Sequence, residues 1–111
     1  MNRSRAPRGR WLYAILLDDA VLGVASFRAA NPGHRLGTHC LYVGSTGLTP
    51  AQRFERHKAG VKSNAFVRTY GVRVLDDLCC QLDTSNSDEA EAEERLYADA
   101  LRKRGYAVWQ K

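Results

Sequence analysis

The sequence predicts an α+β fold in which a small sheet of three strands is flanked by helices. Three short segments, at 11–17, 39–43 and 78–82, are rich in aliphatic, aromatic and β-branched residues, a composition typical of strands. The segments between and after them carry apolar residues at helical spacing, with capping residues at their ends. A chain of 111 residues has room for one such domain with a single modest core.

A strand and a helix form the first unit. The segment 11–17 is aromatic and aliphatic, which favours the first strand. Asp18 or Asp19 can then cap a helix predicted at 20–30, whose apolar residues recur at helical spacing. An Asn-Pro-Gly sequence at 31–33 should end this helix. A glycine inside the segment costs the helix about 1 kcal/mol relative to alanine.

A strand, a tight turn and the start of a helix follow one another from Leu41 to Gly60. The second strand is predicted at 39–43. Thr49 is an expected N-cap, because it is followed by proline at the first helical position and by Gln52 at the position that completes a capping box. We therefore predict a helix at 50–59, ended by the glycine that follows it.

The second half of the chain adds two helices and one strand. A short helix is predicted at 64–70, with Ser63 or Asn64 at its start and a glycine at its end. The apolar segment 78–82 is bounded by polar residues and is predicted as the third strand. The last helix, at 88–104, has acidic residues in its first turns and basic residues in its last turn, which complements the helix dipole. The segment 106–109 should pack against the core.

A phenol, a guanidinium and an imidazole are expected to lie close together near the start of the helix at 50–59. Arg53 and His57 are four residues apart and therefore share one face of this helix. That face looks back toward the end of the strand that carries Tyr42. A helix N-terminus attracts phosphate, and arginine binds phosphate oxygens with two hydrogen bonds. The arrangement indicates phosphodiester chemistry.

Glu94 interrupts an apolar stripe on the last helix, and the carboxylate there needs a partner such as a divalent ion or Arg53. Glu93 on the neighbouring face is the alternative. The stripe consists of Ala90, Glu94, Tyr97, Ala98 and Leu101.

These residues together resemble the GIY-YIG nuclease family, over about residues 11 to 109. Tyr42-Val43-Gly44 is similar to the second half of the family signature, and Trp11-Leu12-Tyr13 occupies the place of the first half. Arg53 matches the helix arginine, His57 falls where relatives have histidine or tyrosine, and Glu94 matches the metal-binding glutamate. The resemblance implies an antiparallel three-stranded sheet flanked by helices, with a helix inserted between the first two strands.

The resemblance also implies a mechanism of divalent-metal-dependent hydrolysis. Tyr42 would activate the water that attacks phosphorus, although a phenol with a pKa near 10 needs help to lose its proton. Arg53 would bind a phosphate oxygen, His57 could exchange protons, and Tyr13 would orient phosphate or water. Glu94 would hold one Mg²⁺ or Mn²⁺ ion. Seven further residues are expected to contact substrate: Gly44, Ser45, Arg56, Lys58, Lys62, Asn64 and Arg68.

The sequence departs from the family pattern in three places. The two signature strands usually form a close hairpin, whereas 28 residues separate Tyr13 from Tyr42 here, so residues 18–38 are an insertion. Ser45 stands where some relatives have lysine. The asparagine that often follows the glutamate is absent, and Gln110 is only a loose substitute. We expect these departures to affect rate and substrate choice more than fold.

The charge distribution suits a nucleic-acid substrate. The formal net charge is +5, and the block 53–73 contains six basic residues and one acid. The block 76–94 contains eight acids and no base, which suits a divalent cation. Residues 1–10 are predicted to be a flexible basic arm that lies along nucleic acid or only aids solubility, and residues 11–111 a single nuclease domain.

We expect a soluble cytoplasmic protein, because the chain has neither an apolar run of 18 residues nor a signal-peptide pattern. Cys40, Cys79 and Cys80 are an odd number of thiols, and without zinc-binding spacing a structural zinc site is disfavoured. DNA is expected to be the substrate rather than RNA, and a partner protein could provide targeting.

Two other interpretations stay open. One is a non-catalytic nucleic-acid-binding module that keeps the fold and the basic face. The other is a nucleotide-binding protein that uses the Gly-Ser-Thr-Gly at 44–47 as a phosphate loop, which the absence of a Walker lysine disfavours.

Overall fold

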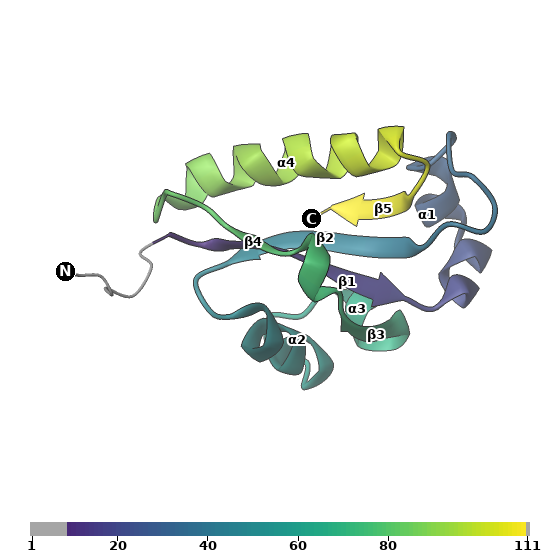
Figure 1. Ribbon diagram of the computed structural model, residues 1–111. Helices are drawn as coiled ribbons and strands as arrows, with labels where there is room; N and C mark the ends of the chain where they lie inside the picture. Colours follow the sequence, from purple (N-terminus) through teal and green to yellow (C-terminus); the bar gives the residue numbers. More distant parts are fainter. Residues whose placement is uncertain (1–8, 111) are drawn as a thin grey trace.

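A sheet of five strands forms the centre of the molecule, and helices pack on both of its faces (Figure 1). The computed structural model describes residues 9–110. The strands run in the order β3-β1-β2-β5, and β4 also pairs with β1. They are β1 (Trp11–Leu17), β2 (Cys40–Thr46), β3 (Gly71–Val74), β4 (Cys80–Gln81) and β5 (Ala107–Gln110). The helices are α1 (Ala25–Ala29), α2 (Pro50–Lys58), α3 (Ala65–Tyr70) and α4 (Ser87–Lys103), with 3-10 helices η1 (Asp19–Gly23) and η2 (Asp76–Leu78).

Alternate residues of β1 face two separate cores. Tyr13, Ile15 and Leu17 pack on one face of the sheet, against side chains of α1 and α3. Ala14 packs on the other face, against α4. A strand buried on both faces is apolar along its whole length, which is why 11–17 lacks the alternation of a half-exposed strand.

The α+β class is confirmed, but the sheet is larger than the three strands predicted. The sequence marked Gly71, where β3 begins, only as the end of a helix, and the segment 106–109, most of which forms β5, was expected to pack against the core but was not assigned as a strand. β5 is parallel to β2, so the sheet is not wholly antiparallel. The predicted strand at 78–82 shrinks to the two residues of β4, because η2 occupies the start of that segment. Strands of two to four residues are too short for periodicity to separate them from loops.

The inserted segment folds as two short helical pieces rather than the single helix predicted at 20–30. Asp18 caps η1 by accepting a hydrogen bond from the Ala20 N–H. The backbone becomes extended at Val24, after Gly23, and only Ala25–Ala29 is α-helical. Glycine and β-branched valine both lower helix propensity, which explains the break.

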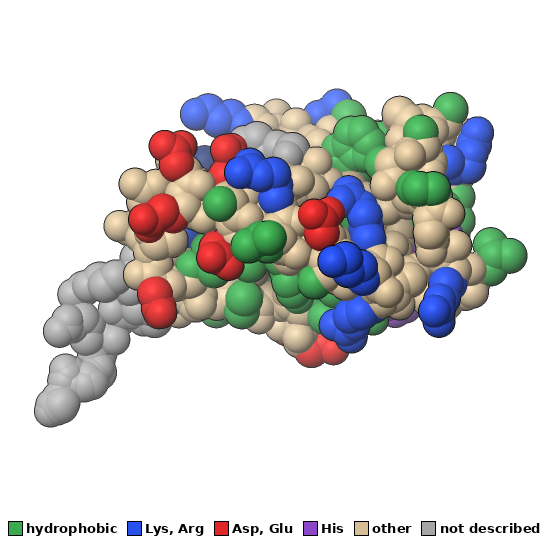
Figure 2. Space-filling view, turned by 90° about the horizontal axis from the view of Figure 1, so that it is seen from above, with side chains coloured by type: hydrophobic (Ala, Val, Ile, Leu, Met, Phe, Trp, Pro, Cys, Tyr) green, Lys and Arg blue, Asp and Glu red, His purple; other side chains and the backbone are tan. Residues whose placement is uncertain are grey.

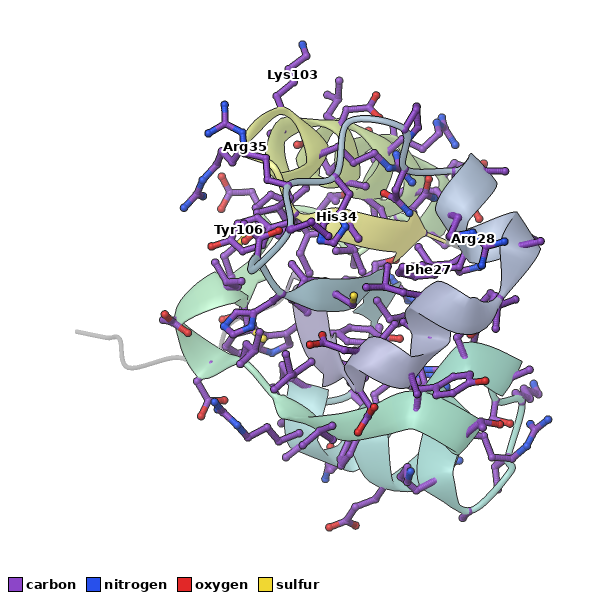
Figure 3. The ribbon with its side chains drawn as sticks, turned by 90° about the vertical axis from the view of Figure 1, so that its right-hand side faces the viewer. Phe27, Arg28, His34, Arg35, Lys103 and Tyr106 are labelled. Carbon is purple, nitrogen blue, oxygen red and sulfur yellow. The ribbon has the colours of Figure 1, made fainter. Side chains whose placement is uncertain are left out.

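The insertion nevertheless leaves the pairing of β1 with β2 intact, since the strands pair in continuous register from Trp11↔Thr46 to Leu17↔Cys40. Phe27 of α1 is fully buried, and its ring lies 5.6 Å from that of Phe66 and 6.4 Å from that of Trp109, between centroids. Figure 3 shows Phe27 directed inward and Arg28 directed outward. The insertion therefore closes one end of the core.

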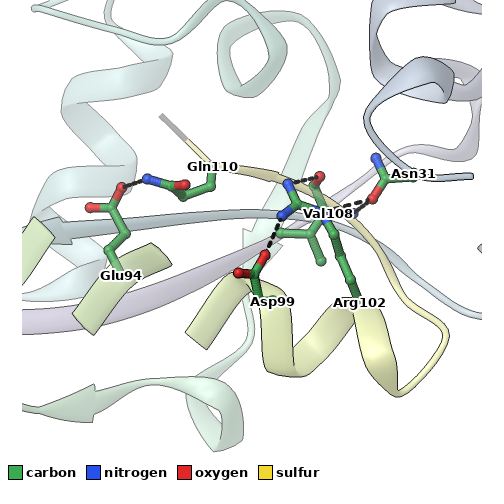
Figure 4. A network of polar contacts seen from close by, with 6 residues as sticks. All are labelled: Asn31, Glu94, Asp99, Arg102, Val108 and Gln110. Carbon is green, nitrogen blue, oxygen red and sulfur yellow. Dashed lines mark hydrogen bonds and ion pairs between the residues drawn. The ribbon is translucent and has the colours of Figure 1, made fainter. Parts of the chain in front are cut away.

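Asn31, directly after α1, connects the insertion to two other elements (Figure 4). Its buried side-chain oxygen accepts hydrogen bonds from the Val108 N–H at 2.7 Å and from Arg102 Nε at 3.3 Å. Its amide nitrogen donates to the Phe27 carbonyl at 2.9 Å. One side chain thus ties α1 to β5 and α4.

The three remaining helices were predicted correctly to within a few residues. Thr49 and Gln52 form the complete capping box at the start of α2. Asn64 caps α3, and Asn86 caps α4 by accepting from two backbone N–H groups. α4 is the longest at 17 residues and is amphipathic, and within residues 9–110 no helix is long and apolar enough to cross a membrane.

Candidate active site

A pocket of about 100 Å³ lies where β1, β2, α2 and α4 approach one another. All five residues predicted as catalytic lie in it or directly beside it: Tyr13, Tyr42, Arg53 and Glu94 line it, and His57 contacts it through Tyr13. Its lining is completed by Arg10, Gly44, Ser45, Ser87 and Glu91. Residues distant in the sequence therefore form one polar pocket, as the pattern predicted.

The pairing of β1 with β2 brings the two tyrosines together. Tyr13 lies opposite Gly44, and the rings of Tyr13 and Tyr42 have centroids 6.1 Å apart. A Cβ atom at position 44 would lie 2.5 Å from the Tyr13 hydroxyl oxygen. Gly44 therefore makes room for the Tyr13 phenol within the strand pair, in addition to lining the pocket.

His57 is fully buried, and both of its ring nitrogens are hydrogen-bonded. The backbone N–H of Asn64 donates to Nδ1 at 3.0 Å, so Nδ1 carries no proton and Nε2 must carry the proton of the neutral ring. The Nε2 atom lies 2.9 Å from the Tyr13 hydroxyl, and therefore donates to it. Burial, with the charge of Arg53 as a smaller cause, lowers the pKa of His57 to about 4. In this arrangement His57 is a neutral donor to Tyr13 and does not accept a proton from Tyr42.

Both phenols are neutral at ordinary pH, mainly because they are buried. Burial and then the charge of Glu94 raise the pKa of Tyr42 to about 12, while hydrogen bonding from Tyr13 and the charge of Arg53 act in the opposite direction. Burial raises the pKa of Tyr13 further still, with Tyr42 as the next cause. Tyr42 is thus the more acidic of the two phenols, and the hydrogen bond from Tyr13 favours the ionised form of Tyr42.

Arg53 combines a structural contact with a place in the pocket. Its two terminal nitrogens donate to the carbonyls of Val61 and Lys62, at 3.3 and 2.8 Å. These bonds hold the loop after α2 against the helix. The guanidinium lies close to both phenols. Its positive charge therefore acts to lower the pKa of Tyr13 and Tyr42, against the larger effect of burial.

Glu94 is only 2% exposed, whereas Glu93 is exposed on the outer face of α4. Gln110 Nε2 donates to Glu94 Oε1 at 2.8 Å (Figure 4). The residue noted as a loose substitute for the missing asparagine therefore contacts the predicted metal ligand. Sequence reasoning could not place this contact, because it depends on β5 lying beside α4.

The carboxylates of the pocket are of the kind that can hold a divalent metal ion. Within residues 9–110, no group of three His, Cys, Asp or Glu side chains is close enough to hold a metal ion. Mg²⁺ does not require such a group, since it commonly binds one or two carboxylates and completes its shell with water and substrate phosphate. Glu94, with Glu91 in the same pocket, is a donor set of that kind.

A second hollow, of about 280 Å³, adjoins the pocket on the side of α2. Tyr42 and Arg53 line both hollows, and Lys62 and Asn64, two of the predicted substrate contacts, line the second. Ser63 and His57 complete this lining.

Three predicted substrate contacts do not lie in either hollow. Arg56 lies in another surface depression, with Leu48. Lys58 donates to the carbonyls of Arg68 and Gly71, both at 3.1 Å, and so stabilises the end of α3. The side chain of Arg68 donates to the Ser63 hydroxyl. Runs of basic residues on a helix distribute around its axis, so charge alone did not identify which ones face the pocket.

Besides Ser87 and Glu91, the pocket contains one further residue that the sequence did not single out, Arg10. It belonged to the predicted basic arm at 1–10, of which residues 1–8 lie outside the described part of the chain. The one feature of the sequence that could have indicated a place in the site is that Arg10 lies directly before the strand that carries Tyr13.

A comparison with known protein families shows to which family the chain belongs. The model of the GIY-YIG catalytic domain matches residues 34–107, two thirds of the chain. The chain belongs to the GIY-YIG family. No curated protein and no solved structure matches it.

Membership in the GIY-YIG family implies nuclease-type hydrolysis of nucleic acid at the family level. The matched range includes Tyr42, Arg53, His57 and Glu94. Tyr13, Arg10 and Gln110 lie outside the matched range, so the family match does not bear on them, and the structure connects them with the site.

Proposed function

We propose that this GIY-YIG protein is a metal-dependent endonuclease that hydrolyses phosphodiester bonds of DNA. The observation that carries the proposal is the convergence of Tyr42, Arg53 and Glu94 on one pocket. A water-activating oxygen, a fixed positive charge and a buried carboxylate are the groups that metal-assisted phosphodiester hydrolysis needs.

A directed series of hydrogen bonds supports Tyr42 as the group that takes the proton of the attacking water. The N–H of Asn64 fixes the tautomer of His57, and His57 donates to the Tyr13 oxygen. The Tyr13 proton is then available to donate to Tyr42, and this hydrogen bond favours the Tyr42 phenolate. Because His57 already donates to the Tyr13 oxygen, the Tyr13 hydroxyl acts as a donor toward Tyr42, which stabilises the base form of Tyr42.

The remaining groups of the pocket act on phosphate. Arg53, held by its bonds to the following loop, can offer N–H groups to a non-bridging phosphate oxygen, and its charge stabilises the negative charge that develops in the transition state. Glu94, oriented by Gln110, would hold Mg²⁺ or Mn²⁺. When bound, that ion would supply Lewis-acid stabilisation of the leaving oxygen and would counter the charge of Glu94 that raises the pKa of Tyr42.

The state of the three cysteines favours a cytoplasmic location. Cys40, Cys79 and Cys80 are all free thiols in the structure, which suits a reducing compartment. We infer a cytoplasmic location on this basis, and expect targeting to depend on a partner protein.

Cleavage of labelled single-stranded, duplex and branched DNA, and of RNA, tests the proposal. We expect cutting of DNA with Mg²⁺ or Mn²⁺, none with EDTA, and a loss of roughly a hundredfold or more in Arg53→Ala, because the transition state loses its fixed charge. Arg73→Ala, at the other end of the sheet opposite Leu16, removes an equal charge and should cut normally. If no nucleic acid is cut but DNA is still bound with a steep salt dependence, the non-catalytic binding module replaces the nuclease.

A further inference from the structure

The segment directly before β1 is built into the fold. The Arg10 N–H donates to the Thr84 carbonyl at 2.8 Å, and the Leu82 N–H donates to the Arg10 carbonyl at 2.7 Å. Gly9 is required beside it, because a Cβ atom there would lie 1.4 Å from the Leu82 carbonyl oxygen. The backbone therefore fixes where the Arg10 side chain starts.

This side chain enters the candidate active site without a partner. Arg10 lines the same pocket as Tyr13, Tyr42 and Glu94. Its Nε is the one buried side-chain nitrogen or oxygen without a hydrogen-bond partner among the described residues. Within the same part of the chain the only ion pair is Arg102 with Asp99, so Arg10 pairs with neither carboxylate of its pocket.

The half-buried guanidinium of Arg10, which has a buried Nε and no ion-pair partner among the described residues, calls for an anion from outside the chain. Buried donors are almost always satisfied, and leaving one unsatisfied costs about 1 to 3 kcal/mol. The guanidinium cannot escape this cost by losing its proton. Its planar arrangement of N–H groups matches the oxygens of a phosphate, which is the anionic group of the substrate already proposed for this pocket.

We propose that Arg10 is a second phosphate-binding arginine of this site, one that binds a non-bridging phosphate oxygen of the nucleic-acid strand. The inference rests on the proposed function for the identity of the ligand. Arg53 and Arg10 would then hold the strand from two separate elements, α2 and the segment before β1. Arg10 adds affinity and register, and it takes no part in proton transfer.

The competing explanation is that Arg10 only offsets the charge of Glu91 and Glu94 through space. The two explanations differ in what ligand binding does to the Nε–H group. A phosphate bound by the terminal nitrogens of Arg10 changes the environment of the neighbouring Nε–H group, whereas a role in charge balance affects stability and leaves the guanidinium without a new acceptor.

The test measures binding of a short fluorescent single-stranded DNA in EDTA, so that it does not depend on cleavage. Arg10→Ala should weaken binding by about tenfold or more, the value of one charge-assisted hydrogen bond. The slope of log affinity against log salt should fall by about 0.7, because one phosphate of the single strand is no longer neutralised. Arg10→Lys should recover the slope but only part of the affinity, because lysine keeps the charge and lacks the planar donors. Arg73→Ala, distant from the pocket, is the matched control.

The second arm observes the Arg10 Nε–H resonance by NMR, assigned by its loss in Arg10→Lys. Addition of the oligonucleotide should shift this resonance, and inorganic phosphate should shift it in the same direction. Unchanged affinity and salt slope in folded Arg10→Ala, or an Nε–H resonance that does not move at saturating DNA, would overturn the proposal. A wild type that binds DNA through Arg10 but cuts nothing would instead refute the nuclease and leave the phosphate site standing.

Discussion

Because Gly44 has no side chain, the phenol of Tyr13 can occupy its position in the site. The space that a Cβ would occupy is filled by the Tyr13 phenol, and this phenol joins His57 to Tyr42. Close packing between two strands therefore explains the glycine at this position of the family signature, which also lines the pocket.

We predict that Gly44→Ala displaces the Tyr13 ring and breaks its 2.9 Å hydrogen bond to His57. Overpacking of this kind costs about 1 to 3 kcal/mol of unfolding free energy. Cleavage should fall as well, because the Tyr42 phenolate loses a donor. Urea denaturation and single-turnover cleavage measure the two effects. Gly33→Ala, where no atom lies within 4 Å of the added Cβ, should change neither, and an equal effect of both substitutions would refute the packing argument.

His57 gives a second prediction, through the dependence of stability on pH. Its pKa is about 4 in the folded protein and near 6.5 when unfolded, so the unfolded chain binds more protons between these values. The stability that His57 contributes is complete above about pH 6.5 and falls by at most about 3 kcal/mol as the pH drops to about 4.

The measurement is the free energy of unfolding of the wild type and of His57→Gln between about pH 7 and pH 4. Glutamine can accept from the Asn64 N–H and donate to Tyr13, but it does not titrate in this range. The wild type should therefore lose stability more steeply than the variant. Parallel curves would show that His57 is not held neutral by burial.

At the scale of elements, the insertion at 18–38 is a structural addition. Its buried groups close the end of the core and pair with β5 and α4, through Phe27 and Asn31 in particular. This accounts for a long connection between strands that still pair in full register.

We predict that Asn31→Ala destabilises the fold by about 2 to 4 kcal/mol, because it leaves the buried Val108 N–H and the Phe27 carbonyl without their partner. Asn31→Asp keeps the oxygen that accepts from Val108 and loses only the donor to Phe27, so it should cost less. Urea denaturation of both variants is the measurement. An alanine variant as stable as the wild type would mean that the insertion is dispensable.

The elements that sequence could predict are those with strong local signals. The capping residues of α2, α3 and α4 fixed their first turns, and the 3.6-residue period placed Glu94 on the buried face. β3 and β5 were not predicted as strands, because each has only four residues and its assignment depends on pairing with a strand distant in the sequence. The contacts of Arg10 and Gln110 were out of reach for the same reason, since each depends on the position of a neighbouring strand or loop.

At the scale of the whole molecule, charge is divided along α4. Figure 2 shows acidic side chains gathered over the first half of this helix and basic ones toward its end. The candidate pocket lies at the acidic half, where Glu91 and Glu94 meet Arg10 and Arg53. The proposed nuclease would use this arrangement to bind a cation beside a phosphate strand, as metal-assisted cleavage requires.

We propose that the buried carboxylate of Glu94, and not the exposed carboxylate of Glu93, supports catalysis. The most direct test compares single-turnover cleavage of DNA by Glu94→Gln and Glu93→Gln at saturating Mg²⁺, with thermal melts to confirm that both variants fold. We expect the buried substitution to reduce the rate by roughly a hundredfold or more and the exposed one to leave it within about twofold of the wild type. Full activity in Glu94→Gln, or an equal loss in both variants, would contradict the site described for this protein.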